Sequence, residues 1–269
     1  MKKRGKNFLY LLSTALMTSA VVPWGPDFAL SNGHTVTLQV ADINIGILYV
    51  FAVVSMGVYG IMIGGWASNN KFSLMSSLRA ASQAISYELA MGLALIALLM
   101  TTGSLSLKTI VEQQVTGNWW NIVYQPLGFL LFFIAALAEC NRTPFDLPEA
   151  ENELNFGYHQ EYSSMKLGFY LFAEYINMIM SSAIMASMYF GGYDLPFFNE
   201  ASVAPNIAAM IGVGTLLIKI VLFIFLFMWI RWTIPRFRYD QLMNLGWKTM
   251  IPLALFNLLL TGALILAKL

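Results

Sequence analysis

Long apolar stretches separated by short polar loops dominate the chain. Seven of them approach the roughly 20 residues that a helix needs to cross the hydrocarbon core of a membrane. These predicted spans are residues 7–23, 43–65, 84–102, 121–138, 165–190, 207–229 and 249–267. The pattern predicts an all-α integral membrane protein, a polytopic bundle of seven transmembrane helices that forms one membrane domain over residues 1–269.

The composition supports a membrane protein and excludes several other classes. Of 269 residues, 58% are hydrophobic and only 11% are charged, where soluble domains carry about 25% charged residues. The net charge of +1 offers no field for a nucleic-acid partner. One cysteine, Cys140, cannot build an iron-sulfur cluster, and His34 and His159 lack metal-ligand spacing. We therefore expect no metal and no bound cofactor in this chain.

The basic residues predict the orientation in the membrane. Lys and Arg concentrate in cytoplasmic loops, and twelve of the 15 occur at one set of span ends: Lys2, Lys3, Arg4, Lys6, Lys71, Arg79, Arg142, Lys166, Arg231, Arg236, Arg238 and Lys248. This places the amino terminus in the cytoplasm and the carboxyl terminus outside. Alternatively, the basic start and its apolar run are a signal peptide, whose cleavage would leave six spans in the same orientation.

The predicted cytoplasmic loop 139–164 holds the densest chemistry. Its carboxylates are Glu139, Asp146, Glu149, Glu151, Glu153 and Glu161. Residues 146–149 are typical of a helix start, and Glu149 and Glu153 would then share one helix face. Carboxylates this close disfavour simultaneous ionisation, so the cluster could hold and release a proton. The alternative is a solvated acidic loop at the membrane surface.

Four charged residues lie inside or at the ends of predicted spans: Glu88, Glu139, Glu174 and Lys219. A charge at the bilayer centre costs about 2.5–3.5 kcal/mol even on the lenient insertion scale. We expect these residues to form a polar path between the helices. Alternatively, paired charges fix the helix register, or Glu88 and Glu139 reach out to the interface.

Aromatic and hydrogen-bonding side chains are mixed after Gly157. Tyr158, His159 and Tyr162 combine flat apolar faces with hydrogen-bonding tips, which suits a flat amphipathic ligand that enters from the membrane. A lone histidine is more often a structural donor. The basic stretch 231–240 is interpreted as an orientation signal first and as a site for anionic headgroups or a peripheral protein second.

Four segments, residues 65–92, 138–166, 173–175 and 229–248, give the chain a specific resemblance. Over nearly its whole length it resembles the H-type membrane subunits of respiratory complex I, the NADH-quinone oxidoreductase. The resemblance implies a quinone-chamber and energy-coupling role in the bacterial inner membrane. Electrons would reach quinone from an iron-sulfur cluster in a neighbouring subunit. Other membrane subunits, the peripheral quinone-module subunits and lipid would be its partners.

The resemblance also implies two sets of site residues. The charge or proton path would comprise Glu88, Glu139, Asp146, Glu149, Glu151, Glu153, Glu161, Glu174 and Lys219. The quinone contacts would be Arg142, Tyr158, His159 and Tyr162. Three other functions compete with this one: the membrane subunit of an energy-converting hydrogenase, a stand-alone ion or solute transporter, and a passive scaffold.

The chain departs from the family at its start. Family members begin with another transmembrane helix, followed by a cytoplasmic segment rich in Arg, Gly and Pro. Nothing in this sequence corresponds to either, and Met1 falls just before the family's second helix. The seven predicted spans therefore match the last seven of the family's eight.

Overall fold

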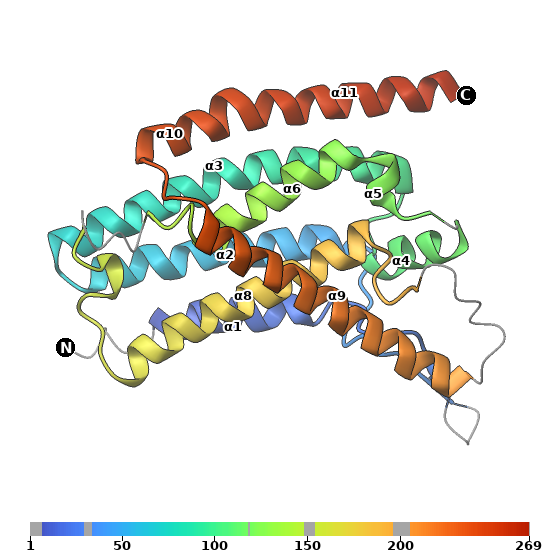
Figure 1. Cartoon of the computed structure of the whole chain (residues 1–269). Coiled ribbons are helices and arrows are strands. Elements are labelled where there is room, and N and C mark those ends of the chain that lie inside the picture. Colours follow the sequence, from blue (N-terminus) through green and yellow to red (C-terminus); the bar gives the residue numbers. More distant parts are fainter. Residues whose placement is uncertain (1–6, 30–33, 118, 148–153, 196–204, 269) are drawn as a thin grey trace.

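A bundle of long helices forms the protein in the computed structural model (Figure 1). The structure describes residues 7–29, 34–117, 119–147, 154–195 and 205–268. The helices are α1 (Asn7–Ser19), α2 (Gly46–Ala67), α3 (Lys71–Thr102), α4 (Leu107–Thr116), α5 (Asn121–Tyr124), α6 (Pro126–Glu139), α8 (Met165–Tyr189), α9 (Pro205–Thr233), α10 (Tyr239–Asn244) and α11 (Ile251–Lys268). A 3₁₀ turn, η2 (Gly157–His159), precedes α8, and a π-helical segment, η4 (Leu245–Met250), joins α10 to α11. Two short strands, β1 (Phe28–Ala29) and β2 (Thr35–Val36), pair antiparallel.

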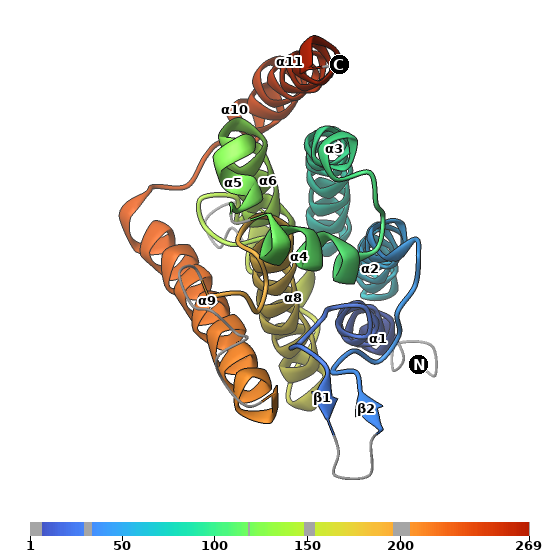
Figure 2. The same ribbon diagram turned by 90° about the vertical axis from the view of Figure 1, so that its right-hand side faces the viewer.

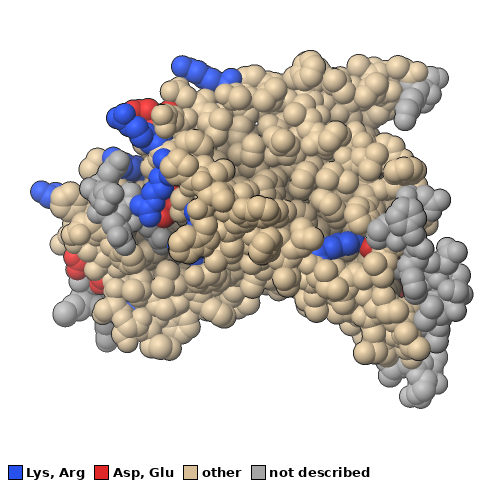
Figure 3. Space-filling model, in the orientation of Figure 1, with Lys and Arg blue, Asp and Glu red and all other residues tan. Residues whose placement is uncertain are grey.

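Five helical segments among the described residues are long and apolar enough to cross a membrane. They are Gly46–Ala67, Lys71–Thr102, Met165–Tyr189, Asn206–Thr233 and Tyr239–Ala267, with Pro126–Glu139 as a shorter apolar helix. The chain is therefore an all-α polytopic membrane protein. Its lipid-facing surface is apolar, and the charged side chains visible in Figure 3 lie mostly at the end of the bundle where α10 is found.

The helix bounds differ from the predicted spans where a polar helix cap, a proline or a polar first turn occurs. The third span is predicted from residue 84, yet α3 already begins at Lys71, because the Asn70 side chain accepts a hydrogen bond from the Phe72 amide and caps the helix. The fourth span is divided at Gln125 into α5 and α6, since Pro126 has no amide to continue a helix. The helix of the seventh span begins at Tyr239, ahead of the apolar stretch.

Contacts between neighbouring helices link α1, α2, α3, α6 and α8 into the central part of the bundle. Helix α1 lies against α2 and α8, α2 lies against α3, and α3 lies against α6 and α11. Figure 2 views this arrangement along the bundle, with α9 beside α8 on one side and α11 at the margin. Helices α1, α2, α3, α6 and α8 therefore surround a common interior.

Candidate functional site: an internal acidic cavity

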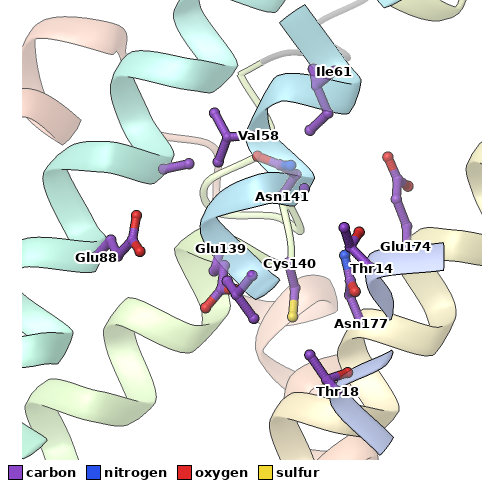
Figure 4. Close-up of a pocket in the computed structure, with 13 residues that line it drawn as sticks. Thr14, Thr18, Val58, Ile61, Glu88, Glu139, Cys140, Asn141, Glu174 and Asn177 are labelled. Atoms are coloured by element: carbon purple, nitrogen blue, oxygen red, sulfur yellow. The ribbon is translucent and has the colours of Figure 1, made fainter. Parts of the chain in front are cut away.

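Three carboxylates from three helices face one cavity in this interior (Figure 4). Glu88 comes from α3, Glu139 ends α6 and Glu174 comes from α8. In Figure 4, Glu88 and Glu174 lie on opposite sides, with Glu139 and Cys140 between them. The volume inside it that the centre of a water molecule can reach is about 40 Å³. The structure thus brings together three of the acids that the sequence singled out.

Glu174 sits at the centre of a cluster of polar groups. Its side chain is buried, and the Tyr158 hydroxyl donates a hydrogen bond to Oε1 at 2.6 Å. Arg142 Nη2 lies 3.8 Å from Oε2, and His159 Nε2 lies 3.9 Å from Oε1. The Arg142 guanidinium also stacks 4.5 Å from the centre of the Tyr175 ring. A buried carboxylate is tolerated only with such partners, because removing it from water costs several kcal/mol.

The turn before α8 delivers the aromatic members of this cluster. Asn155 and Phe156 have positive φ values of 50° and 72°, which reverse the chain just before η2. Tyr158 and His159 then point inward, each only 1% exposed. The Tyr162 hydroxyl donates to the Gly64 carbonyl at 2.8 Å. In this structure these side chains contact the protein itself, so a flat ligand would need them to rearrange.

Glu88 and Glu139 occupy the other end of the cavity. Ser55 of α2 forms a hydrogen bond with Glu88 Oε1. A second, mainly apolar cavity adjoins the first and shares Glu139 and Cys140 with it; the centre of a water molecule can reach about 30 Å³ of it. Glu139 therefore lines both cavities, of which the first has the larger share of polar surface.

Sequence reasoning missed several polar residues that line the acidic cavity. They are Thr14 and Thr18 of α1, Cys140, Asn141, and Asn177 of α8. The signal was present for three of them, because Thr14 and Thr18 lie four residues apart within a predicted span and Asn177 follows Glu174 by three. Residues at these spacings share one helix face.

Two further acids of the loop, Asp146 and Glu161, do not line this cavity. Asp146 is buried and receives a hydrogen bond from Arg236 Nη2 at 3.0 Å. Glu161 is exposed and accepts a hydrogen bond from the Asn70 side chain at 3.2 Å. Glu149, Glu151, Glu153 and the predicted helix start lie wholly or partly outside the described residues.

Lys219 is not part of the acidic cluster. Its ammonium donates to the carbonyls of Phe190, Gly192 and Asp194 at 2.7, 2.9 and 2.6 Å, and it lies 4.6 Å from the centre of the Trp120 ring. These acceptors follow the carboxyl end of α8. At 1.5 Å per residue, Phe190 is about 24 Å along the α8 axis from Glu174. The partly buried lysine thus has backbone partners, and the structure does not bring it to the three carboxylates of the cavity.

The fold and the site together define a class of protein. It is a polytopic membrane protein with ionisable groups in its interior, where such groups commonly mark substrate or proton routes. The chain matches the NADH dehydrogenase family over residues 7–262, and it belongs to that family.

Its relatives include H subunits of NADH-quinone oxidoreductase. The chain is similar to an H subunit, numbered 1, of the enzyme from Cytophaga hutchinsonii, with 65% identity over 95% of this chain and 74% of the relative. It is 62% identical to the H subunit from Flavobacterium johnsoniae, over 95% of this chain and 73% of the relative. It is 49% identical to the H subunit from Thermomicrobium roseum, over 94% and 73%.

Proposed function

We propose that the chain is an energy-coupling subunit of a proton-translocating NADH-quinone oxidoreductase in a bacterial inner membrane. In this proposal it borders the quinone chamber and passes the effect of quinone reduction into the membrane arm. The observation that carries the proposal is the cavity shared by Glu88, Glu139 and Glu174. The relatives support the reaction, because their names give NADH and quinone as its reactants.

The carboxylates of this chain would bind and release protons, and its cationic groups would balance their charge. Electrons would come from an iron-sulfur cluster of a neighbouring subunit, and quinone would be the substrate of the complex. Arg142 offsets the charge of Glu174 across 3.8 Å, and Tyr158 orients its carboxylate. A change of charge near Arg142 and Glu174 would alter which of the cavity's carboxylates holds a proton, because like charges in a poorly solvated site disfavour one another.

The loop acids would connect the chamber to this cavity. Asp146, Glu149, Glu151, Glu153 and Glu161 belong to the proposed charge path, and Arg142, Tyr158, His159 and Tyr162 to the quinone side of it. The basic loops would face the cytoplasm, towards the peripheral subunits, with the carboxyl terminus outside. Lys219 would serve the path only indirectly, since its ammonium is bound at the far end of α8.

Replacing Glu139 by Gln in the assembled complex tests the proposal. NADH oxidation with an artificial acceptor that takes electrons from the peripheral arm should stay unchanged. Quinone-linked proton pumping should fall by at least about tenfold, since positioned acid–base groups contribute on the order of 10²–10⁴-fold to the steps they serve. The matched control is Glu112→Gln, an exposed acid of α4. Full pumping by the Glu139 variant would refute the role of the cavity.

Three other functions make different predictions. A hydrogenase-type membrane subunit would couple to proton reduction and be indifferent to quinone. A stand-alone transporter would bind an ion or solute when purified without peripheral subunits. A passive scaffold would tolerate Glu139→Gln in every activity. The names of the relatives favour the quinone-linked complex over the hydrogenase.

A further inference from the structure

A second group of buried polar side chains lies where α5 and α6 are separated. Gln125 occupies this break and is only 3% exposed. Its Nε2 donates to the Ala97 carbonyl of α3 at 2.7 Å and to Thr261 Oγ1 of α11 at 3.4 Å. Its Oε1 has no hydrogen-bond partner within the part of the chain that the structure describes.

Asn257 of α11 presents the complementary group to the same place. Its side chain is 4% exposed, and its Nδ2 has no hydrogen-bond partner among residues 7–29, 34–117, 119–147, 154–195 and 205–268. One buried acceptor and one buried donor thus occur together. In an apolar interior each unsatisfied group costs free energy comparable to a lost hydrogen bond or more.

Gln125 Oε1 and Asn257 Nδ2 both lie beside Gly128 of α6. A Cβ atom built on Gly128 would lie 3.1 Å from Gln125 Oε1 and 3.2 Å from Asn257 Nδ2. The two side chains form no hydrogen bond with each other, although both approach this point. Glycine places no side-chain atom beside these two groups, whereas any other residue would put a Cβ within 3.2 Å of both. A buried water requires room beside its two to four polar partners, and a side chain at this position would take that room.

We propose that Gln125, Gly128 and Asn257 form a binding site for one water molecule. The water donates to Gln125 Oε1 and accepts from Asn257 Nδ2, which satisfies both groups. It joins the break between α5 and α6 to α11, a helix that otherwise packs mainly against α3. Interhelical polar contacts of this kind fix the relative position of membrane helices. Gly128 is about 16 Å along α6 from Glu139, and none of the three residues lines the acidic cavity, so the site is distinct from it.

A density map of the assembled complex, at a resolution that shows ordered waters, tests the site directly. One peak within hydrogen-bond distance of both Gln125 Oε1 and Asn257 Nδ2 is expected in the wild type, and none in Gly128→Ala, where the new methyl fills the gap. A direct bond between the two amides, an empty gap, or a peak coordinated as a cation would overturn the proposal.

A double-mutant cycle gives a second, independent test on the purified full chain. Gln125→Leu and Asn257→Leu each leave the other group without its water, so each should lower the folded-to-unfolded ratio about tenfold in a detergent titration. The double variant should be no less stable than Gln125→Leu alone, because both lose the hydrogen bonds of Gln125 Nε2 and only the single variant leaves Asn257 Nδ2 without its water. Additive losses would overturn the proposal. Leu259→Ala, a lipid-facing change on the same helix, is the control.

Discussion

Lys219→Met separates a structural role of this lysine from a role in charge transfer. Methionine keeps the long unbranched stem and removes the ammonium. Three carbonyls lose their donor at once, those of Phe190, Gly192 and Asp194. They converge because Gly191 and Gly192 take positive φ values of 72° and 55° after the end of α8. Few other residues adopt this backbone without strain.

The magnitude follows from the bonds that are lost. A hydrogen bond from a charged donor contributes about 1.5–3 kcal/mol, and a buried acceptor left alone costs about 1–3 kcal/mol. Removing the ammonium also abolishes its own desolvation cost, which offsets part of the loss. We expect a net loss of about 3 kcal/mol, roughly a hundredfold in the folded-to-unfolded ratio.

Two measurements on the same preparations decide between the roles. A denaturing detergent titration should show the loss of stability, with Ile218→Met, a neighbouring lipid-facing change, as the control. Proton pumping per assembled complex should remain close to wild type, since the lysine is remote from Glu174. Wild-type stability together with abolished pumping would refute this reasoning and return Lys219 to the charge path.

Three further predictions address the loop, the cavity and the packing around it. Glu149→Gln or Glu153→Gln should impair quinone reduction or pumping and leave NADH oxidation by artificial acceptors intact; if both are silent in activity assays, the loop is a solvated surface. Burial raises the pKa of the Cys140 thiol above its usual range. A permeant maleimide at neutral pH should therefore label the folded chain far more slowly than a Gln113→Cys/Cys140→Ser control, whose thiol is exposed. Equal labelling rates would contradict an enclosed cavity around Cys140. A Cβ on Gly64 would overlap the Tyr170 hydroxyl, so Gly64→Ala should cost about 1–3 kcal/mol in a detergent titration, whereas Gly168→Ala, with open space around it, should not.

The sequence predicted the helices best where apolar length alone decides them. The fifth span, residues 165–190, coincides with α8 (Met165–Tyr189) to within one residue. The beginning of α3 was missed because hydropathy marks membrane depth and not helix formation. Its first turns carry Ser73, Ser76 and Ser77, which are buried against other parts of the protein. A polar helical turn of this kind looks like a loop until its neighbours are known.

Interior charges could be found in the sequence, but their partners could not. A carboxylate in an apolar stretch stands out by its cost, which is why Glu88 and Glu174 were identified from their positions alone. Their hydrogen-bond partners come from elsewhere in the chain: Ser55 lies 33 residues from Glu88, and Tyr158 lies 16 residues from Glu174. Lys219 and Glu174 met the same criterion, yet one is bound by backbone carbonyls and the other by side chains. Carbonyls carry no residue-type signal, so the sequence could not distinguish a lysine that closes a helix end from one that faces an acid.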